Sequence, residues 1–485
     1  GLSLNFVGEI PATGHVYVNG ERLGAFLPPP ASGGHILDHG VQALPLALAA
    51  PRRALVLHAW AGASAGLLLS RQGVTVTAVE PHPVVADLLR TAYPSPDALL
   101  HVISEDCRAF LGRPREPYDL ILLPPLGAFG GGIGLQAQQE NYLLTREGFS
   151  ALWNALPQGD GDAGMLSFCV HLDQPPRQSL RLLALAADAM RQAGVRDPSP
   201  HVAAVRSWEM LAVPVSTRPF DEAAGRRLEE FARSLGFDRV WVPGRGPARE
   251  DRFHLMLDDL LPHGFEAILA GNGERFVRDY PFDIAPPEDD HPYFHQFIRW
   301  GRLGDMRLLL GPDSPVFVEM GAILVALTAA ALAVAALALI VLPLSRLSGK
   351  DASKSVPRAG APAVLTYFGA IGLGFMFLEM VWIQRFTLFW GQPLYSAAGV
   401  LTALLCGMGA GSALSAGVSC GPRAIRSALA WALALIGVLS AGLPHLMAAG
   451  LGWPEPLKWA AGLGVLSASA VVFGLPFPLA LRAVG

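Results

Sequence analysis

Two acidic residues follow short apolar runs near the start of the chain, where they could bind a small molecule. Glu80 comes directly after the run Val74–Val79, and Asp106 comes shortly after the run His101–Ile103. Short apolar runs rich in β-branched residues are typical of buried strands in a parallel sheet. Because ligands of such sheets bind at the carboxyl ends of the strands, Glu80 and Asp106 are candidate ligand-binding residues.

A turn of small residues precedes Glu80 at a spacing typical of ribose-binding folds. The run Ala54–Leu57 leads into this turn, and Glu80 lies 18 residues after Gly62. A spacing of about 20 residues between a glycine turn and an acid is typical of folds that bind a ribose. A carboxylate suits this task because it can accept hydrogen bonds from both ribose hydroxyls. Trp60, in the same turn, is expected either to pack locally or to stack on a base.

Structural explanations remain open for the same residues. Glu80 could stabilise the start of the helix that follows it, and Asp106 could cap the short helix after it. His58 could be an ordinary loop histidine. Tyr142 follows the glycine-rich stretch 130–134 and could line a pocket.

Several classes of site and partner are not expected. The stretch 289–295 contains the residue types of a metal site but not its usual spacing, so no metal site is predicted. The four cysteines lie far apart and indicate neither a disulfide framework nor zinc. A net charge of −4 gives no indication of nucleic acid as a partner.

Alternating strand and helix patterns are expected to position these residues. They predict an α/β fold with a Rossmann-like parallel sheet, and Asn19-Gly20 predicts an N-terminal β-hairpin over residues 15–26. One uninterrupted strand is expected over residues 202–213. The predicted divisions are a hairpin and entry helix (1–50), the α/β domain (51–245), a linker and juxtamembrane segment with one helix near 264–270 (246–318), and a transmembrane bundle (319–485).

The last third of the chain predicts an integral membrane protein. Five apolar segments are long enough to cross a bilayer, which takes about 20 residues per helix; they are residues 321–344, 363–384, 395–417, 428–451 and 460–481. Small residues at 407–412 favour helix–helix association in the membrane. Glu379 is placed near the end of the second segment, where it can reach the interface. We expect the bundle to be truncated, because the chain starts without Met and stops just after an apolar segment.

The side of the membrane on which the soluble region lies is left open. The loops after the first, third and fifth segments hold more Lys and Arg than the alternate loops. Cytoplasmic loops usually carry this excess, so the pattern weakly favours an external soluble region. A function that uses a cytoplasmic cofactor demands the opposite orientation.

The order of these motifs resembles spermidine synthases, and more specifically bacterial membrane proteins in which a spermidine-synthase-like domain is fused to membrane helices. The resemblance covers about residues 10–300 and rests on the hairpin, the turn at 54–66, Val79-Glu80, Glu105-Asp106, residues 118–121 and residues 140–143. It implies a class I S-adenosylmethionine-type fold in which Gly62 approaches the amino-acid tail, Glu80 holds the ribose and Asp106 contacts the adenine amino group. The implied cofactor is S-adenosylmethionine or its decarboxylated form. The implied setting is a bacterial inner membrane, with a small molecule such as a polyamine as substrate.

Two departures from that family lead to two hypotheses. His58 and Trp60 stand where the family has glycine, and residues 123–127 (Leu-Pro-Pro-Leu-Gly) lack the catalytic acid of the synthases. Asp119, earlier on the strand, is expected to be structural. The first hypothesis is a membrane-anchored methyl- or aminopropyltransferase, with aminopropyl transfer disfavoured and the catalytic residue unassigned. The second is a catalytically degenerate nucleoside-binding module attached to a membrane transporter or interaction protein.

Overall fold

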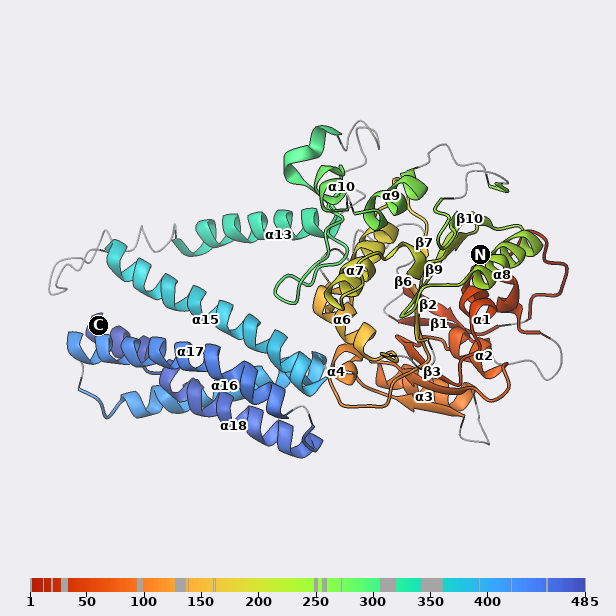
Figure 1. Cartoon of the computed structure of the whole chain (residues 1–485). Helices are drawn as coiled ribbons and strands as arrows, with labels where there is room; N and C mark the ends of the chain where they lie inside the picture. Colours follow the sequence, from red (N-terminus) through yellow and green to blue (C-terminus); the bar gives the residue numbers. More distant parts are fainter. Residues whose placement is uncertain are drawn as a thin grey trace. The chain divides into compact units, whose positions relative to one another are not determined.

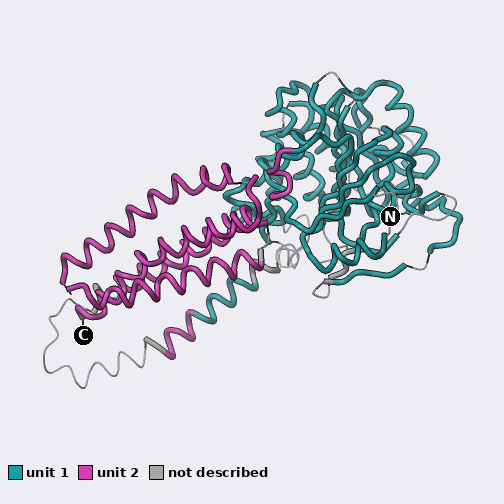
Figure 2. Tube along the Cα trace, turned by 90° about the horizontal axis from the view of Figure 1, so that it is seen from below, with its two compact units in different colours: residues 1–107, 115–332 teal, residues 108–114, 333–485 magenta. Residues whose placement is uncertain are grey.

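The structure is a computed structural model of the chain and consists of two compact units. One unit holds residues 1–107 and 115–332, and the other holds residues 108–114 and 333–485 (Figure 2). The structure describes residues 2–11, 13–18, 21–27, 34–93, 99–126, 137, 139–159, 161, 163–247, 252–254, 260–271, 273–305, 320–341, 361–391, 393–419, 421–450 and 452–484.

The first unit is built on an eight-stranded sheet in the order β10-β8-β9-β7-β6-β3-β4-β5 (Figure 1). The strands are β3 Arg53–Leu57, β4 Thr75–Val79, β5 Leu100–Ile103, β6 Leu120–Leu126, β7 Met165–His171, β8 Ala204–Arg206, β9 Met210–Ser216 and β10 Asp238–Trp241. Strands β5, β4, β3, β6 and β7 are parallel. Strands β9, β8 and β10 extend the sheet in antiparallel pairing. The Rossmann-like α/β class is therefore confirmed, in a mixed sheet.

The single strand expected over residues 202–213 is wrong. The chain turns at 207–209 and forms β8 and β9 as antiparallel neighbours. The Ser207 hydroxyl oxygen accepts hydrogen bonds from the amides of Glu209 (3.3 Å) and Met210 (3.1 Å). Serine side chains stabilise turns in this way by satisfying nearby backbone groups.

Helices cover both faces of this sheet. They are α1 Leu44–Leu48, α2 Ala63–Leu69, α3 Pro83–Ala92, α6 Arg146–Asn154, α7 Gln178–Gln192 and α8 Glu222–Leu235. A further helix, α4 Cys107–Leu111, follows β5 in the chain. Cys169 of β7 belongs to a core cluster shared with α1, α2, α3 and α8. The adjacent Phe168 contacts Phe149 of α6, with ring centroids 6.4 Å apart. Because successive strand residues point to opposite faces, α6 covers the other face.

The predicted N-terminal hairpin is confirmed, and it packs on the turn after β3. It consists of β1 His15–Val18 and β2 Glu21–Ala25. Val16 packs with Ala61 and Val85 in a small buried cluster. A Cβ on Gly24, where φ is +149°, would lie 3.3 Å from the Cβ of Ala61, so the hairpin backbone approaches the turn closely.

The segment after β10 contains more structure than the single helix that was expected. It forms α9 Leu260–Leu269, α10 Gly273–Asp279 and the short 3-10 helix η5 Trp300–Arg302. Gly264 of α9 lies against Leu180 of α7, whose Cδ2 would be 2.5 Å from an added Cβ. This part of the segment therefore packs on α7 of the α/β unit.

The second unit is helical, and four helical segments among its described residues are long and apolar enough to cross a membrane. Its helices are α15 Ala361–Trp390, α16 Pro393–Ser415, α17 Pro422–Gly450, α18 Glu455–Phe473 and α19 Pro476–Val484 (Figure 1). The four candidate spans are Thr366–Trp390, Leu394–Ser415, Pro422–Gly450 and Glu455–Ala483. The sequence predicted five. The first of these, 321–344, is represented by α13 Met320–Ala336 and the π-helical η6 Leu337–Val341, which count as a shorter apolar helix.

Glycines in α16 allow it to pack closely on α18. A Cβ on Gly407 would lie 2.5 Å from the Cβ of Ala470, and one on Gly411 would lie 2.1 Å from the carbonyl oxygen of Val471. Within this unit, the small residues of 407–412 therefore serve helix–helix packing, as expected for lipid-embedded helices.

Glu379 lies elsewhere in its helix than expected. Because α15 continues to Trp390, Glu379 is near the middle of the span Thr366–Trp390, not near its end. An acid at this depth is costly to place in hydrocarbon.

Candidate functional site

The turn after β3 has a left-handed backbone at every second residue. His58 has φ +52°, Trp60 +48° and Gly62 +76°. Only glycine adopts this region freely, and other residues lose about 1–2 kcal/mol there. The two positions at which the sequence resemblance led us to expect glycine thus have the backbone of glycine, although His58 and Trp60 occupy them.

Glu80 fixes this turn to the end of β4. Its side chain is buried, with Oε2 accepting from the Trp60 amide at 2.8 Å and Oε1 from the His82 amide at 3.0 Å. The Glu80 amide donates to the carbonyl of Ile103 at 2.9 Å. The end of β5 is thereby joined to the end of β4 and to the turn after β3. Burial raises the pKa of Glu80, and the two amide hydrogen bonds oppose that rise.

Gly62 is required by packing as well as by its φ. It precedes α2, and a Cβ there would lie 2.6 Å from both Leu89 Cδ2 and Tyr93 Cε2 of the α3 region. The Tyr93 hydroxyl donates to the carbonyl of Ala61 and accepts from the Leu27 amide, each at 2.9 Å. Contact of Gly62 with a ligand stays a prediction.

Asp106 and Cys107 bring the end of β5 to the same turn. Asp106 is half-buried between β5 and α4. The Cys107 sulfur is buried and accepts from the His58 amide at 3.3 Å. Burial raises the pKa of the Cys107 thiol and lowers the pKa of His58 to about 4, so both groups are neutral at pH 7. Cys107 could not be identified from the sequence, because a lone cysteine has no distinguishing spacing.

Tyr142 belongs to a second cluster, on the connection from β6 to α6. It begins the 3-10 helix η3 Tyr142–Leu144, and its hydroxyl donates to Glu140 Oε2 at 3.1 Å. The Tyr293 hydroxyl donates to Glu140 Oε1 at 3.3 Å. Burial, and then the Glu140 carboxylate, raise the pKa of both phenols, so both stay protonated. Tyr293 was missed in the sequence because it lies 151 positions after Tyr142 in a segment read as a linker.

The two clusters lie along one edge of the sheet, at its topological switch. Strands β4 and β5 follow β3 on one side and β6 lies on the other, and ligands of open α/β sheets bind in the crevice at such a point. Glu80, Trp60, Gly62 and Asp106 surround the ends of β3, β4 and β5. The stretch 130–134 lies outside the described residues.

The end of β6 contains no acid. The strand runs through Leu126, with an irregularity between Leu123 and Leu126 where Pro124 and Pro125 stand. Asp119 is structural, as expected: its Oδ2 accepts from the amides of Arg52 and Arg53 at 2.9 Å each, at the opposite end of the sheet.

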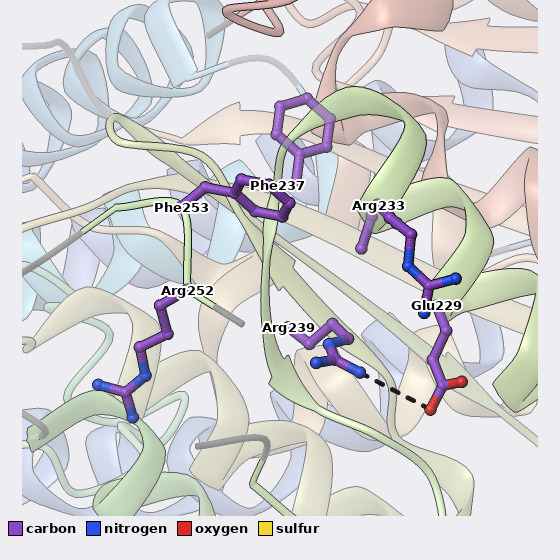
Figure 3. A pocket seen from close by; sticks show the side chains of 7 residues that line it. Glu229, Arg233, Phe237, Arg239, Arg252 and Phe253 are labelled. Atoms are coloured by element: carbon purple, nitrogen blue, oxygen red, sulfur yellow. Dashed lines mark ion pairs between the residues drawn. The ribbon is translucent and has the colours of Figure 1, made fainter. Parts of the chain in front are cut away.

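A separate cavity of about 300 Å³ lies between α8 and β10 (Figure 3). Arg239 and Glu229 form an ion pair in it at 3.9 Å, and Phe237 and Phe253 line its apolar side. Four strands separate β10 from β3 in the sheet order. Neighbouring strands lie about 4.8 Å apart, so the distance across the sheet separates this cavity from the residues around Glu80.

Comparison with known proteins finds fold likeness alone. No protein-family model and no curated protein matches the chain. A spermidine synthase in complex with the transition-state analogue AdoDATO is 15% identical, covering 41% of this chain and 69% of that one, with a TM-score of 0.28. A probable spermidine synthase from Corynebacterium glutamicum is 16% identical (51% and 91% covered, TM-score 0.34). A SAM-dependent methyltransferase from Agrobacterium tumefaciens is 16% identical (44% and 72% covered, TM-score 0.28). The structural neighbours are thus spermidine synthases and SAM-dependent methyltransferases.

Proposed function

We propose that this protein is a membrane-anchored, spermidine-synthase-like transferase that binds S-adenosylmethionine or a related nucleoside at the ends of β3, β4 and β5. One observation carries the proposal. A buried carboxylate, Glu80, stands at the carboxyl end of β4 and is bonded to the turn after β3, beside the topological switch of the sheet. This is the position at which α/β sheets bind nucleosides.

The Glu80 carboxylate has acceptor capacity left for a ribose. A carboxylate offers about four lone-pair sites, and the amides of Trp60 and His82 use two of them. The remaining two could accept the two hydroxyl protons of a ribose. In this proposal Asp106 binds the adenine amino group, and the turn at Trp60 and Gly62 borders the amino-acid tail.

The nucleoside would supply an alkyl group activated by a sulfonium centre, and the chain would orient the acceptor. Because residues 123–126 contain no acid, we favour methyl transfer over aminopropyl transfer to a polyamine. Tyr142, on the connection that leaves β6, is proposed to border the acceptor. We place the protein in a bacterial inner membrane, with the apolar helices in the lipid bilayer.

Calorimetry of the full chain in detergent tests the proposal. S-adenosylmethionine and its decarboxylated form are titrated into wild type, Glu80→Gln and a control, Glu116→Gln. Glu116 is an exposed acid that pairs with Arg53 near the opposite end of β3. We expect Glu80→Gln to weaken binding about tenfold, the usual scale for a lost charge-assisted hydrogen bond, and the control to bind like wild type.

The proposal would be contradicted if neither nucleoside produced heat of binding with wild type. It would also be contradicted if Glu80→Gln and Glu116→Gln bound the nucleosides equally tightly. Binding without transfer to any acceptor would instead support the degenerate module of the second hypothesis.

A further inference from the structure

The segment of residues 280–299, here called the strap, is held on α7 by buried groups. Arg181 of α7 is 2% exposed, and its guanidinium donates to the carbonyls of Asp283 and Phe294. The same guanidinium lies over the Phe297 ring, 4.6 Å from its centroid. Near the start of the strap, the Tyr280 hydroxyl donates to the carbonyl of Pro176 at 2.8 Å. Both ends of the strap are thus anchored by buried groups, on α7 and on Pro176 just before it.

The middle of the strap, residues 287–293, is bonded through backbone groups to the connection between β6 and α6. The Asn141 amide donates to the carbonyl of Pro292 at 2.7 Å, and the Arg146 amide donates to the carbonyl of Pro287 at 2.9 Å. These two bonds fix both ends of the short segment that carries Tyr142.

Side chains add further bonds between the same two segments. The Thr145 hydroxyl donates to Asp289 Oδ1 at 2.6 Å, and the Asp289 amide donates to Glu147 Oε2 at 3.0 Å. The Tyr293 hydroxyl donates to Glu140. The residues of 287–293 therefore determine where η3 and the start of α6 lie.

The anchors and the middle of the strap differ in exposure. Phe282, Phe294 and Phe297 are fully buried. In the middle, Pro287 and Pro292 are buried and Asp289 and Tyr293 are half-buried, but the bonds from the Asp289 amide to Glu147 and from the Tyr293 hydroxyl to Glu140 lie at exposed positions. Exposed hydrogen bonds and ion pairs contribute little and open locally far more often than buried ones. The exposed bonds of Asp289 and Tyr293 can thus open while the ends of the strap remain anchored on α7.

We propose that residues 287–293 form a latch on the connection that follows β6. Closed, the latch holds Tyr142 in place at the carboxyl edge of the sheet. Open, it frees residues 139–145 and gives an acceptor access to that edge. The access step rests on the proposed function, whereas the latch itself does not.

Hydrogen exchange of the full chain in detergent, without any ligand, tests the latch. The released variant is Asp289→Ala with Tyr293→Phe. The matched control is Asp290→Ala, because Asp290 is the adjacent acid and is exposed, and no hydrogen bond or ion pair is found for it among the described residues. We expect exchange in the peptide that covers 141–148 to speed up about tenfold in the released variant. The peptides of α7 should keep the wild-type rate, and the control should match wild type throughout.

Three results would overturn the latch: unchanged exchange at 141–148 in the released variant, equal acceleration in the control, or equal acceleration in α7. The last result would mean that the strap unfolds as a whole. A second arm measures nucleoside association, which we expect to be faster in the released variant. If the wild type binds no nucleoside, the proposed function is wrong. The latch is then still tested by the hydrogen-exchange result alone.

Discussion

The left-handed backbone at Trp60 makes a prediction whose sign is unusual. At most positions, replacing alanine by glycine destabilises a protein by about 0.5–1 kcal/mol, because glycine has more freedom in the unfolded chain. At φ +48°, an alanine keeps the strain of about 1–2 kcal/mol, and a glycine removes it. The balance favours glycine by about 0.5–1 kcal/mol. Trp60→Gly should therefore be more stable than Trp60→Ala.

The comparison of these two variants isolates the backbone. Both lack the indole, so its lost packing and any lost ligand contact cancel between them. Thermal unfolding of the α/β unit in the detergent-solubilised chain should show Trp60→Gly melting about 2 °C higher, given about 2–4 °C per kcal/mol for domains of this size. Ala63→Gly in the first turn of α2, where φ is not positive, should melt lower than wild type.

A melting temperature of Trp60→Ala equal to or above that of Trp60→Gly would refute the left-handed turn. If both variants also bind the nucleosides less tightly than wild type by the same factor, the indole contacts the ligand. Equal binding by wild type and both variants would assign Trp60 to packing alone.

Two other predictions concern proton binding and helix packing. Burial, with a smaller effect of Arg181, lowers the pKa of His295 to about 4 from its usual 6.5. Between these pH values the unfolded chain binds a proton that the folded chain does not, so stability should fall by up to about 3 kcal/mol as the pH decreases from 6.5 to 4; His295→Gln should flatten this part of a urea-unfolding profile. Gly411→Ala should lower the melting temperature of the membrane unit, since overpacking costs about 1–3 kcal/mol, whereas Gly409→Ala, with nothing within 4 Å of the added Cβ, should not; equal melting of the two would contradict the α16–α18 contact.

Local patterns were enough to predict the parallel part of the sheet and the positions of Glu80 and Asp106. Each strand there is a short apolar run; Glu80 follows its run directly, and Asp106 follows its run after two intervening residues. The family resemblance also led us to expect glycine at positions 58 and 60, and the backbone is left-handed at both. The sequence did not show that two other residues would accept that conformation, since this depends on the hydrogen bonds that Glu80 and Cys107 make to the turn.

The strap and the antiparallel edge could not be predicted, because both depend on contacts between distant residues. Asp289 bonds to Thr145, 144 positions earlier, and no periodicity in 280–299 signals such pairing. The strand break at Ser207 has no glycine or proline to mark it. Glu379 was misplaced for a related reason: the charged Arg385 suggested an end to the apolar segment, yet α15 continues to Trp390.

Membrane sidedness gives the most direct external test of the proposed function. Four crossing helices would place the start of α15 on the same side as Arg423, Arg426 and Arg482, the side richer in basic residues and therefore cytoplasmic. The α/β unit then lies in the cytoplasm unless α13 also crosses. We expect Glu116→Cys, at an exposed position, to resist a membrane-impermeant maleimide in intact cells and to react after permeabilisation. The parent chain is the control, because it carries the buried Cys107 and Cys169 together with the exposed Cys406 and with Cys420, and only labelling above its level is assigned to position 116. Labelling of Glu116→Cys in intact cells would show that α13 crosses the membrane, and it would leave the α/β unit on the side where a cytoplasmic nucleoside cannot reach Glu80.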